Sequence, residues 1–264
     1  MALKVSVICR RSLMIAEAAA SPSRDQVPLA LFLKSHFWIA LKMDSRLVCL
    51  LILAGLSEAA AQEDLTRKVF VFRTEPSEAY IILKSLPKEP LQNLTICLRS
   101  YTDLTRPYGL FSYATESEDN EILIFKPKRG EYRVYIGGEY LSFKVPEDTL
   151  DWEHVCFGWE SATGIAEFWM NGKPWPRKGL KKGYMVGSGA FILLGQEQDG
   201  FGGTYDSYNS FSGELTDVYM WDFLLSPHKM RAAYQDLQLP RCALGWKNLH
   251  YEIKGDVVVK GRLR

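Results

Sequence analysis

Short apolar stretches recur along the sequence from residue 69 onward and are separated by turn-forming residues. Ten of them are rich in β-branched and aromatic side chains, and they span residues 69–72, 80–83, 94–101, 122–125, 132–136, 141–145, 154–159, 166–170, 191–194 and 215–221. Gly, Pro, Asn and Asp fill the intervals. This pattern is typical of an all-β sandwich or jelly roll.

Two local signals refine this prediction. Asn171-Gly172 follows one predicted strand and suits a type I′ hairpin turn, which needs positive φ at both central residues. Ser226-Pro227 predicts the start of a short helix, with Ser as the N-cap and Pro at the first helical position. Met230, Ala233 and Tyr234 share one face of that helix, and we expect this face to be buried against a sheet.

The segment 43–61 has the layout of a secretory signal peptide. Arg46 precedes an apolar run over 47–56, and three alanines end at Ala61, after which we expect cleavage. The alternative is a buried core helix, but the Ala-x-Ala ending is what a signal peptidase requires. The apolar run is too short to cross a bilayer as a stable helix, so we expect a secreted chain without a membrane span. Residues 1–42 precede this complete leader, and we interpret them as an extension from an upstream or alternative start.

Composition limits the classes of function. The 264 residues contain 32 Lys and Arg and 31 Asp and Glu, so the chain lacks the basic excess of a protein that binds nucleic acid through a positive face. Seven of the basic and four of the acidic residues lie in 1–61, so cleavage leaves 203 residues with a net charge of −2. We expect residues 62–264 to form a single domain.

Three of the five cysteines lie beyond the leader. Cys97 and Cys156 lie in strand-like apolar runs, whereas Cys242 follows Pro and Arg in a loop-like stretch. In an oxidising compartment two of the three should pair, and we predict a Cys97–Cys156 disulfide worth about 4 kcal/mol in the chain-entropy model. Cys242 then remains as a free thiol or an intermolecular link.

Asn93-Leu94-Thr95 is an N-glycosylation sequon. In a secreted chain it predicts a glycan on Asn93, although such short sequons also arise by chance.

Acidic residues concentrate in two segments. In the first, Glu197 and Asp199 alternate around Gln198, so they point to the same side if the chain is extended, and the following glycines allow Asp206 to fold back toward them. Clustered carboxylates repel one another unless a cation lies among them, and outside the cell the natural cation for oxygen ligands is Ca²⁺. The spacing does not fit an EF-hand. The second segment, 118–121, could close the site, and the alternative is that both are ordinary solvated loops.

Residues 154–161 read HVCFGWES and resemble the pentraxin family motif H-x-C-x-[ST]-W-x-[ST], with Gly158 in place of Ser or Thr. Further matching phrases are FSYAT at 111–115, DNEILIF at 119–125, WESATGIAEFW at 159–169, LGQEQD at 194–199 and YMWD at 219–222. The resemblance covers essentially all of residues 62–264, does not extend to 1–42, and is strongest to the short members of the family.

The resemblance implies a lectin-like jelly-roll β-sandwich with one short helix, a Cys97–Cys156 bridge, a cyclic homopentamer, and two calcium ions per subunit. By position, the first ion would be held by Asp119, Asn120, Glu197, the backbone carbonyl of Gln198, and Asp199. The second would be held by Glu197, Asp199, Asp206 and Asn209. At the position of Asn209 the family has Gln. Because Asn is one methylene shorter, its side-chain oxygen falls about 1.5 Å short of a calcium contact unless the loop moves or water intervenes. The second ion is therefore held less completely.

The resemblance also implies a ligand pocket beside the ions. Leu123, Phe125 and Tyr135 match its apolar positions, next to Asn120, although aromatic strand residues of this kind are by default core residues. Some family members place an acidic residue near the ammonium group of choline, and Tyr140 occupies that position here. We therefore expect phosphoethanolamine, phosphorylated or pyruvylated sugars and anionic polysaccharides to bind in preference to phosphocholine.

Together these features predict a secreted, calcium-dependent, lectin-like pattern-recognition protein of innate immunity and the acute phase, with complement and Fc receptors as partners implied by the family. A second reading is a calcium-independent structural sandwich with a degraded site. A third is a glycoside hydrolase with an E-x-D-x-x-E strand, but Glu197-Gln198-Asp199 continues with Gly200-Phe201-Gly202 and lacks the second catalytic carboxylate. No histidine beyond the leader lies in a nucleophile motif, so we do not expect an enzyme.

Overall fold

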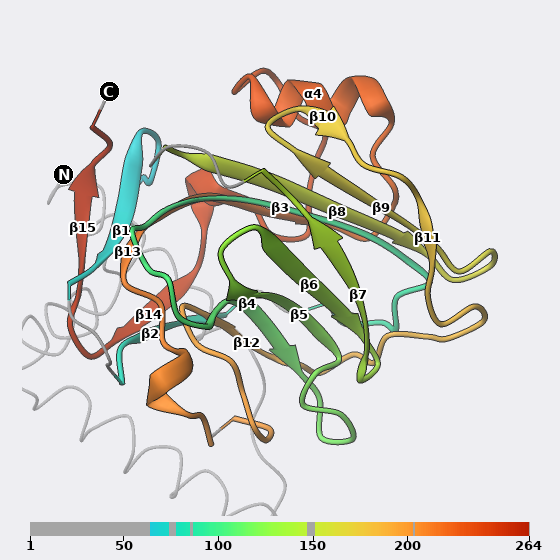
Figure 1. Ribbon diagram of the computed structural model, residues 1–264, viewed down its shortest axis with the longest axis horizontal. Coiled ribbons are helices and arrows are strands. Elements are labelled where there is room, and N and C mark those ends of the chain that lie inside the picture. The colour runs from blue at the N-terminus through green and yellow to red at the C-terminus, as the bar shows by residue number, and fades with distance from the viewer. Residues whose placement is uncertain (1–63, 74–77, 85–86, 147–150, 203, 264) are drawn as a thin grey trace, which may run out of the picture. The chain divides into compact units, whose positions relative to one another are not determined.

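A computed structural model describes residues 64–73, 78–84, 87–146, 151–202 and 204–263 (Figure 1). Within these residues the strands form two antiparallel sheets. The first has the order β10-β9-β8-β3-β13-β1-β15, with β11 also paired to β9, and comprises β1 (Lys68–Phe72), β3 (Asn93–Tyr101), β8 (Glu153–Glu160), β9 (Ile165–Met170), β10 (Lys173–Pro174), β11 (Lys178–Gly179), β13 (Gly213–Trp221) and β15 (Val257–Gly261). The second has the order β14-β2-β12-β4-β5-β6-β7 and comprises β2 (Tyr80–Leu83), β4 (Tyr108–Ala114), β5 (Ile122–Lys128), β6 (Glu131–Ile136), β7 (Glu139–Lys144), β12 (Phe191–Leu194) and β14 (Tyr251–Lys254). We call these sheet A and sheet B.

The hydrophobic core lies between the two sheets. In β6 the core-facing residues Tyr132, Val134 and Ile136 are buried and alternate with partly exposed residues, as the period of two in a strand requires. Ile96 and Phe157 contribute to the same core from sheet A. The predicted lectin-like jelly-roll β-sandwich is thereby confirmed.

All ten predicted strands are present, with small differences at their ends. The prediction missed β4, the short strands β10 and β11, and the two C-terminal strands β14 and β15, which belong to different sheets. Every residue of β4 is buried, because β4 lies between β12 and β5 in the middle of sheet B. The apolar residues of β4 are interrupted by Gly109 and Ser112, so β4 lacks the continuous apolar run that revealed the buried strands β5 and β12.

Sheet A carries the α-helix of the described region on its outer face. Helix α4 (Pro227–Tyr234) is capped by Ser226, whose hydroxyl accepts a hydrogen bond from the Lys229 backbone N–H at 3.4 Å, as predicted. Met230 and Ala233 are buried, but the expectation for Tyr234 was wrong. Tyr234 is 39% exposed, and its ring lies over the Arg99 guanidinium group, with 5.4 Å between Cζ and the ring centroid.

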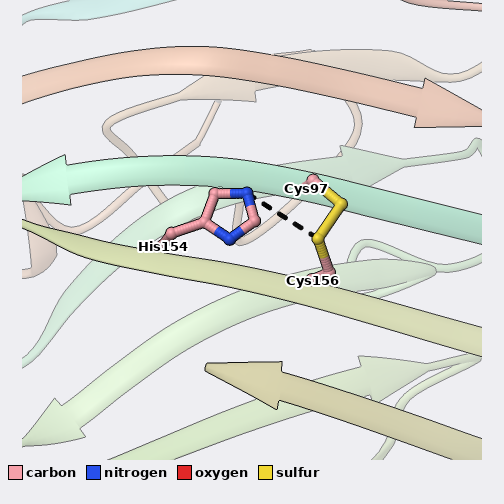
Figure 2. Close-up of side chains that lie close together, drawn as sticks. All are labelled: Cys97, His154 and Cys156. Carbon is pink, nitrogen blue, oxygen red and sulfur yellow. Dashed lines mark hydrogen bonds between the residues drawn. A yellow bond between two sulfur atoms is a disulfide. The ribbon is translucent and has the colours of Figure 1, made fainter. Parts of the chain in front are cut away.

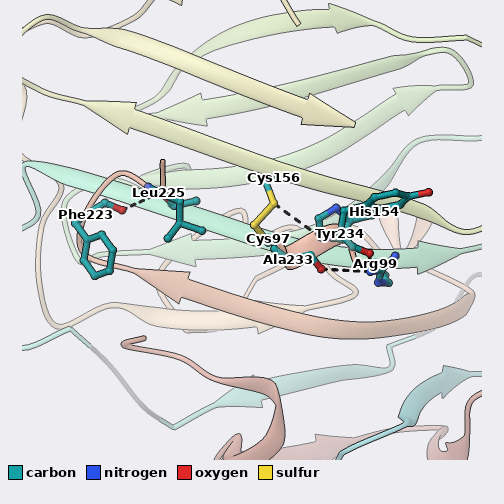
Figure 3. Close-up of a disulfide and its surroundings, with 9 residues drawn as sticks. Cys97, Arg99, His154, Cys156, Phe223, Leu225, Ala233 and Tyr234 are labelled. Carbon is teal, nitrogen blue, oxygen red and sulfur yellow. Dashed lines mark hydrogen bonds between the residues drawn. A yellow bond between two sulfur atoms is a disulfide. The ribbon is translucent and has the colours of Figure 1, made fainter. Parts of the chain in front are cut away.

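The predicted disulfide is confirmed. Cys97 and Cys156 are directly opposite each other on β3 and β8 and are bonded to each other (Figures 2 and 3). They share a buried cluster with Met230 and Ala233 of helix α4. Cys242 carries a free thiol in this single chain, and burial raises its pKa. The predicted hairpin turn is also confirmed, since φ is 49° at Asn171 and 74° at Gly172.

The extension 1–42 and the signal peptide 43–61 lie outside the described residues, so both stay predictions. Among the residues that are described, no helix has the length and hydropathy needed to cross a membrane.

Candidate metal and ligand site

The acidic residues predicted to bind calcium come from three places in the chain. Asp119 and Asn120 directly precede β5, whereas Glu197 and Asp199 follow β12. Asp206 caps the short 3₁₀ helix η1 (Ser207–Asn209), where its carboxylate accepts a hydrogen bond from the Tyr208 backbone N–H at 2.9 Å.

The segment after β12 folds back over the outer face of sheet B. The Gln198 backbone N–H donates to the Ser112 hydroxyl at 3.2 Å, and the Gln198 side-chain amide donates to the carbonyl oxygens of Ser112 and Phe191 at 3.3 and 2.9 Å. The side chain of Gln198 therefore anchors the loop to β4. This leaves its backbone carbonyl for the role that the family resemblance implies.

Gly109 of β4 allows this close packing. A Cβ atom at Gly109 would lie 2.8 Å from the backbone carbon of Gln196 and 2.8 Å from the backbone nitrogen of Glu197. Both neighbours are backbone atoms, so they cannot turn aside as a flexible side chain can. A residue without a Cβ is needed for the chain leading to Glu197 to lie directly on the sheet.

The charges in this region act on one another. Burial, together with the negative charges of Asp199 and Asp119, raises the pKa of Glu197 to about 7. Asp206 contributes in the same direction, whereas a hydrogen bond from the Asn209 side-chain amide, 3.0 Å from Glu197 Oε2, opposes the shift. Burial and the charges of Asp119 and Asp206 likewise raise the pKa of Asp199. The structure thus brings four carboxylates from three segments into one region of unfavourable negative charge, which we call the acidic cluster.

Asn120 supplies a further oxygen beside the acidic cluster. Its backbone N–H and its side-chain amide both donate to Asp119 Oδ1, at 2.8 and 3.2 Å. Its side-chain oxygen is buried and has no hydrogen-bond partner within the described residues. A buried acceptor without a donor is costly, whereas a cation would satisfy it. An all-oxygen donor set with an excess of negative charge fits Ca²⁺.

The acidic side chains are near one another without converging. Among the His, Cys, Asp and Glu side chains that the structure describes, only Cys97, His154 and Cys156 place three potential ligand atoms within 4.8 Å of one another. Both sulfurs of that group belong to the disulfide, so they are not available as thiolate ligands (Figure 2).

The three residues predicted for the apolar pocket share the outer face of sheet B. Leu123 is opposite Tyr135 in the pairing of β5 with β6, and neither Leu123 nor Phe125 belongs to the core cluster between the sheets. Leu123 has no exposed surface and Phe125 is 8% exposed, so both form the floor of this surface. Tyr135 is partly exposed and lies beside Tyr140, with ring centroids 5.0 Å apart. The accessible part of the surface is therefore formed mainly by the two tyrosines.

One residue of this surface was not singled out from the sequence. Arg133 is opposite Phe125 on the neighbouring strand, and its Cζ lies 4.9 Å from the centroid of the Tyr140 ring. Its position two residues before Tyr135 was the available signal, because residues i and i+2 of a strand share a face.

The predicted glycosylation site is at the start of β3. Asn93 is partly exposed, whereas Thr95 of the same sequon is buried. The Thr95 hydroxyl donates to the Phe223 carbonyl at 2.9 Å and accepts from the Leu225 N–H at 3.0 Å, and it thereby connects β3 to the segment before helix α4.

Comparison with known proteins gives consistent matches. The model of the Pentaxin family matches residues 68–261. Serum amyloid P-component of Sus scrofa is 49% identical over 222 residues, which cover 84% of this chain and 99% of that protein. C-reactive protein of Homo sapiens is 47% identical over 220 residues, which cover 83% and 98%. A native heptameric SAP-like pentraxin from Limulus polyphemus has the same fold, with a TM-score of 0.66 and 24% identity over 75% of this chain and 96% of that chain.

Proposed function

Because the chain belongs to the pentraxin family, we propose that it is a secreted pattern-recognition protein of innate immunity that binds anionic ligands in a calcium-dependent manner. The ligands are phosphoethanolamine, phosphorylated or acidic glycans and other polyanions. The observation that carries this proposal is the acidic cluster beside the unpartnered oxygen of Asn120 on the outer face of sheet B.

The side chains divide into two sets of calcium ligands. Asp119, Asn120, Glu197 and Asp199, with the Gln198 carbonyl, would hold the first ion. Glu197 and Asp199 would also take part in a second site with Asp206 and Asn209. When bound, calcium supplies a residual positive field and open coordination positions that accept phosphate or carboxylate oxygens.

The other residues position these groups and contact the ligand. Gln198 holds the loop on β4 through its bonds to Ser112 and the Phe191 carbonyl, so the neighbouring carboxylates stay on the outer face. Tyr135 and Tyr140 offer two adjacent rings against which the carbon part of a ligand packs. The buried Leu123 and Phe125 support those rings from below.

Several copies of a weak site would act together in an oligomer. We propose a cyclic homo-oligomer, with five subunits as the expected ring size. The SAP-like pentraxin from Limulus polyphemus with the same fold is heptameric. Multivalent attachment to a surface of repeated ligands raises the apparent affinity by about 10² to 10⁴. Complement components and Fc receptors are the partners that the family suggests, and a glycan on Asn93 is the expected modification.

The proposal is tested by retention of the secreted protein on a phosphoethanolamine column in millimolar CaCl₂ and its elution by EGTA. Asp199→Asn should abolish retention, whereas Asp222→Asn, a matched change at an exposed acidic residue outside the acidic cluster, should not. Equal retention with and without calcium, or no retention of the wild type on phosphoethanolamine or an anionic polysaccharide, would favour the calcium-independent structural sandwich.

A further inference from the structure

The outer face of sheet B carries a fixed cation next to the proposed ligand surface. Arg133 is on β6, two residues before Tyr135 and directly opposite Phe125 on β5 and Ser142 on β7. Its side chain is 32% exposed. It is therefore on the same face as the two tyrosines and accessible to a ligand that contacts them.

Three contacts fix the position of the Arg133 guanidinium group. Its Nε donates to Glu131 Oε1 at 3.1 Å, and its Cζ lies 4.9 Å from the centroid of the Tyr140 ring. Burial lowers the pKa of Arg133, but hydrogen bonds to Glu131 and to the Tyr135 side chain raise it by more, so the group stays charged. Because Glu131 and Tyr135 use two of the five N–H donors, the guanidinium group retains donors for an anion.

Glu131 neutralises the positive charge of Arg133 only in part. Its carboxylate also accepts a hydrogen bond from the Ser142 hydroxyl at 2.9 Å and lies 3.8 Å from Lys128 Nζ. Two cations thus face one carboxylate, and the local charge on this side of the surface is positive.

The same surface is continuous with the acidic cluster. Burial raises the pKa of Tyr135, and the negative charge of Glu197 adds to this shift, while Arg133 opposes it. The turn between β6 and β7 is hydrogen-bonded to the segment before β5, because the Gly138 N–H donates to the Asn120 carbonyl at 3.1 Å. Tyr135 therefore lies between the proposed metal ligands and Arg133.

We propose that Arg133 is a specificity-determining residue that selects ligands with a second anionic group beside the metal-bound one and disfavours ligands with an ammonium group there. This inference rests on the proposed function. It places phosphorylated acids and polyanionic glycans above phosphoethanolamine among the ligands of that site.

Three phosphate monoesters of similar length test the proposal. Ethyl phosphate has an uncharged end, phosphoethanolamine ends in an ammonium group, and 2-phosphoglycolate ends in a carboxylate. In saturating calcium, the wild type should bind 2-phosphoglycolate about fivefold more tightly than ethyl phosphate, and phosphoethanolamine more weakly than both, as expected for one partly exposed charge pair. Titration calorimetry at two salt concentrations measures the order, and the differences should shrink in high salt.

Arg133 variants separate a specific role from a structural one. Arg133→Gln should weaken binding of 2-phosphoglycolate and strengthen binding of phosphoethanolamine, and Arg133→Lys should restore the wild-type order. A merely structural effect would shift all three ligands in the same direction. Calcium affinity, measured without a phosphate ligand, should be the same in all three proteins.

The outcomes distinguish the two proposals. If no phosphate monoester binds to the wild type in calcium, the proposed function fails. If all three bind with equal affinity, or if Arg133→Gln leaves their order unchanged, the role of Arg133 is overturned and the proposed function stands.

Discussion

The side-chain amide of Asn209 donates a hydrogen bond to Glu197 Oε2 across 3.0 Å. This contact joins the 3₁₀ helix η1 to the loop after β12, so the shorter side chain of Asn209 reaches the acidic cluster. To act as a calcium ligand, however, Asn209 has to turn its oxygen toward the ion and give up this bond. One residue thus links the geometry of the second proposed calcium site to the charge state of the first.

Replacing Asn209 by Gln should strengthen the second calcium site. The added methylene lets the side-chain oxygen reach a 2.3–2.6 Å contact without movement of the loop. We expect the affinity for the second ion to rise about tenfold, while the affinity for the first ion changes little. Calorimetric titration with CaCl₂ measures both, and an Asn209→Asp variant controls for the effect of added charge. Identical second-site affinities in the wild type and Asn209→Gln would contradict the predicted shortfall.

Glu197→Gln should stabilise the metal-free protein and abolish calcium binding. The raised pKa of about 7 means that ionising Glu197 costs stability, and the cost is absent below about pH 4.5 and complete above about pH 7. Glutamine keeps an oxygen for the bond from Asn209 and removes the charge. In EGTA at pH 8 we expect a gain of about 2 kcal/mol, measured by urea denaturation. The gain should disappear near pH 4.5, and a loss of stability at pH 8 would contradict the repulsion inferred here.

The strands of the sandwich could be predicted from the sequence more readily than the order in which they pair. Alternation revealed strands with one polar face, such as β6 (Glu131–Ile136), and apolar runs revealed buried ones, but neither signal is present in β4 (Tyr108–Ala114), where Gly109 and Ser112 interrupt the apolar residues. The role of Gly109 could not be predicted either, because it depends on the backbone of Gln196 and Glu197, which lies against this glycine only in the folded structure. Periodicity describes the two faces of one element and contains no information about which distant segment covers them.

The candidate site was predictable in its parts. The alternation of Glu197 and Asp199 and the glycines after them indicated a folded acidic loop, and the acidic segment 118–121 was a candidate to close the site. The family resemblance then selected Asp119 and Asn120 within that segment. The position of Arg133 beside the tyrosines follows from strand pairing, which periodicity does not give. Tyr234 was predicted to be buried, but it is the last residue of helix α4 and is 39% exposed, and helical spacing does not show where along a helix the contact with the sheet ends.

Gly158, which occupies the Ser or Thr position of the family motif, lies close to two side chains on the outer face of sheet A. A Cβ atom at this position would lie 3.0 Å from Leu224 Cδ2 and 3.3 Å from Met230 Cε, so both side chains would have to shift. Gly158→Ser should therefore destabilise the protein by about 1 kcal/mol. In a Leu224→Val background the cost should fall by about half, because the nearest atom is removed. Thermal denaturation of the four proteins measures this coupling, and strictly additive effects would show that Leu224 is not the obstacle.

His154 should make the protein sensitive to acid. Burial, together with the positive charges of Arg99 and Arg262, lowers its pKa to about 3, whereas an unfolded chain takes up the proton near pH 6.5. The stability that depends on neutral His154 is therefore present above pH 6.5 and is lost as the pH falls toward 3. Between pH 6.5 and 5 we expect a loss of about 1.5 kcal/mol relative to His154→Gln, measured by urea denaturation in EGTA. Parallel pH profiles for the two proteins would contradict a buried neutral imidazole beside the disulfide.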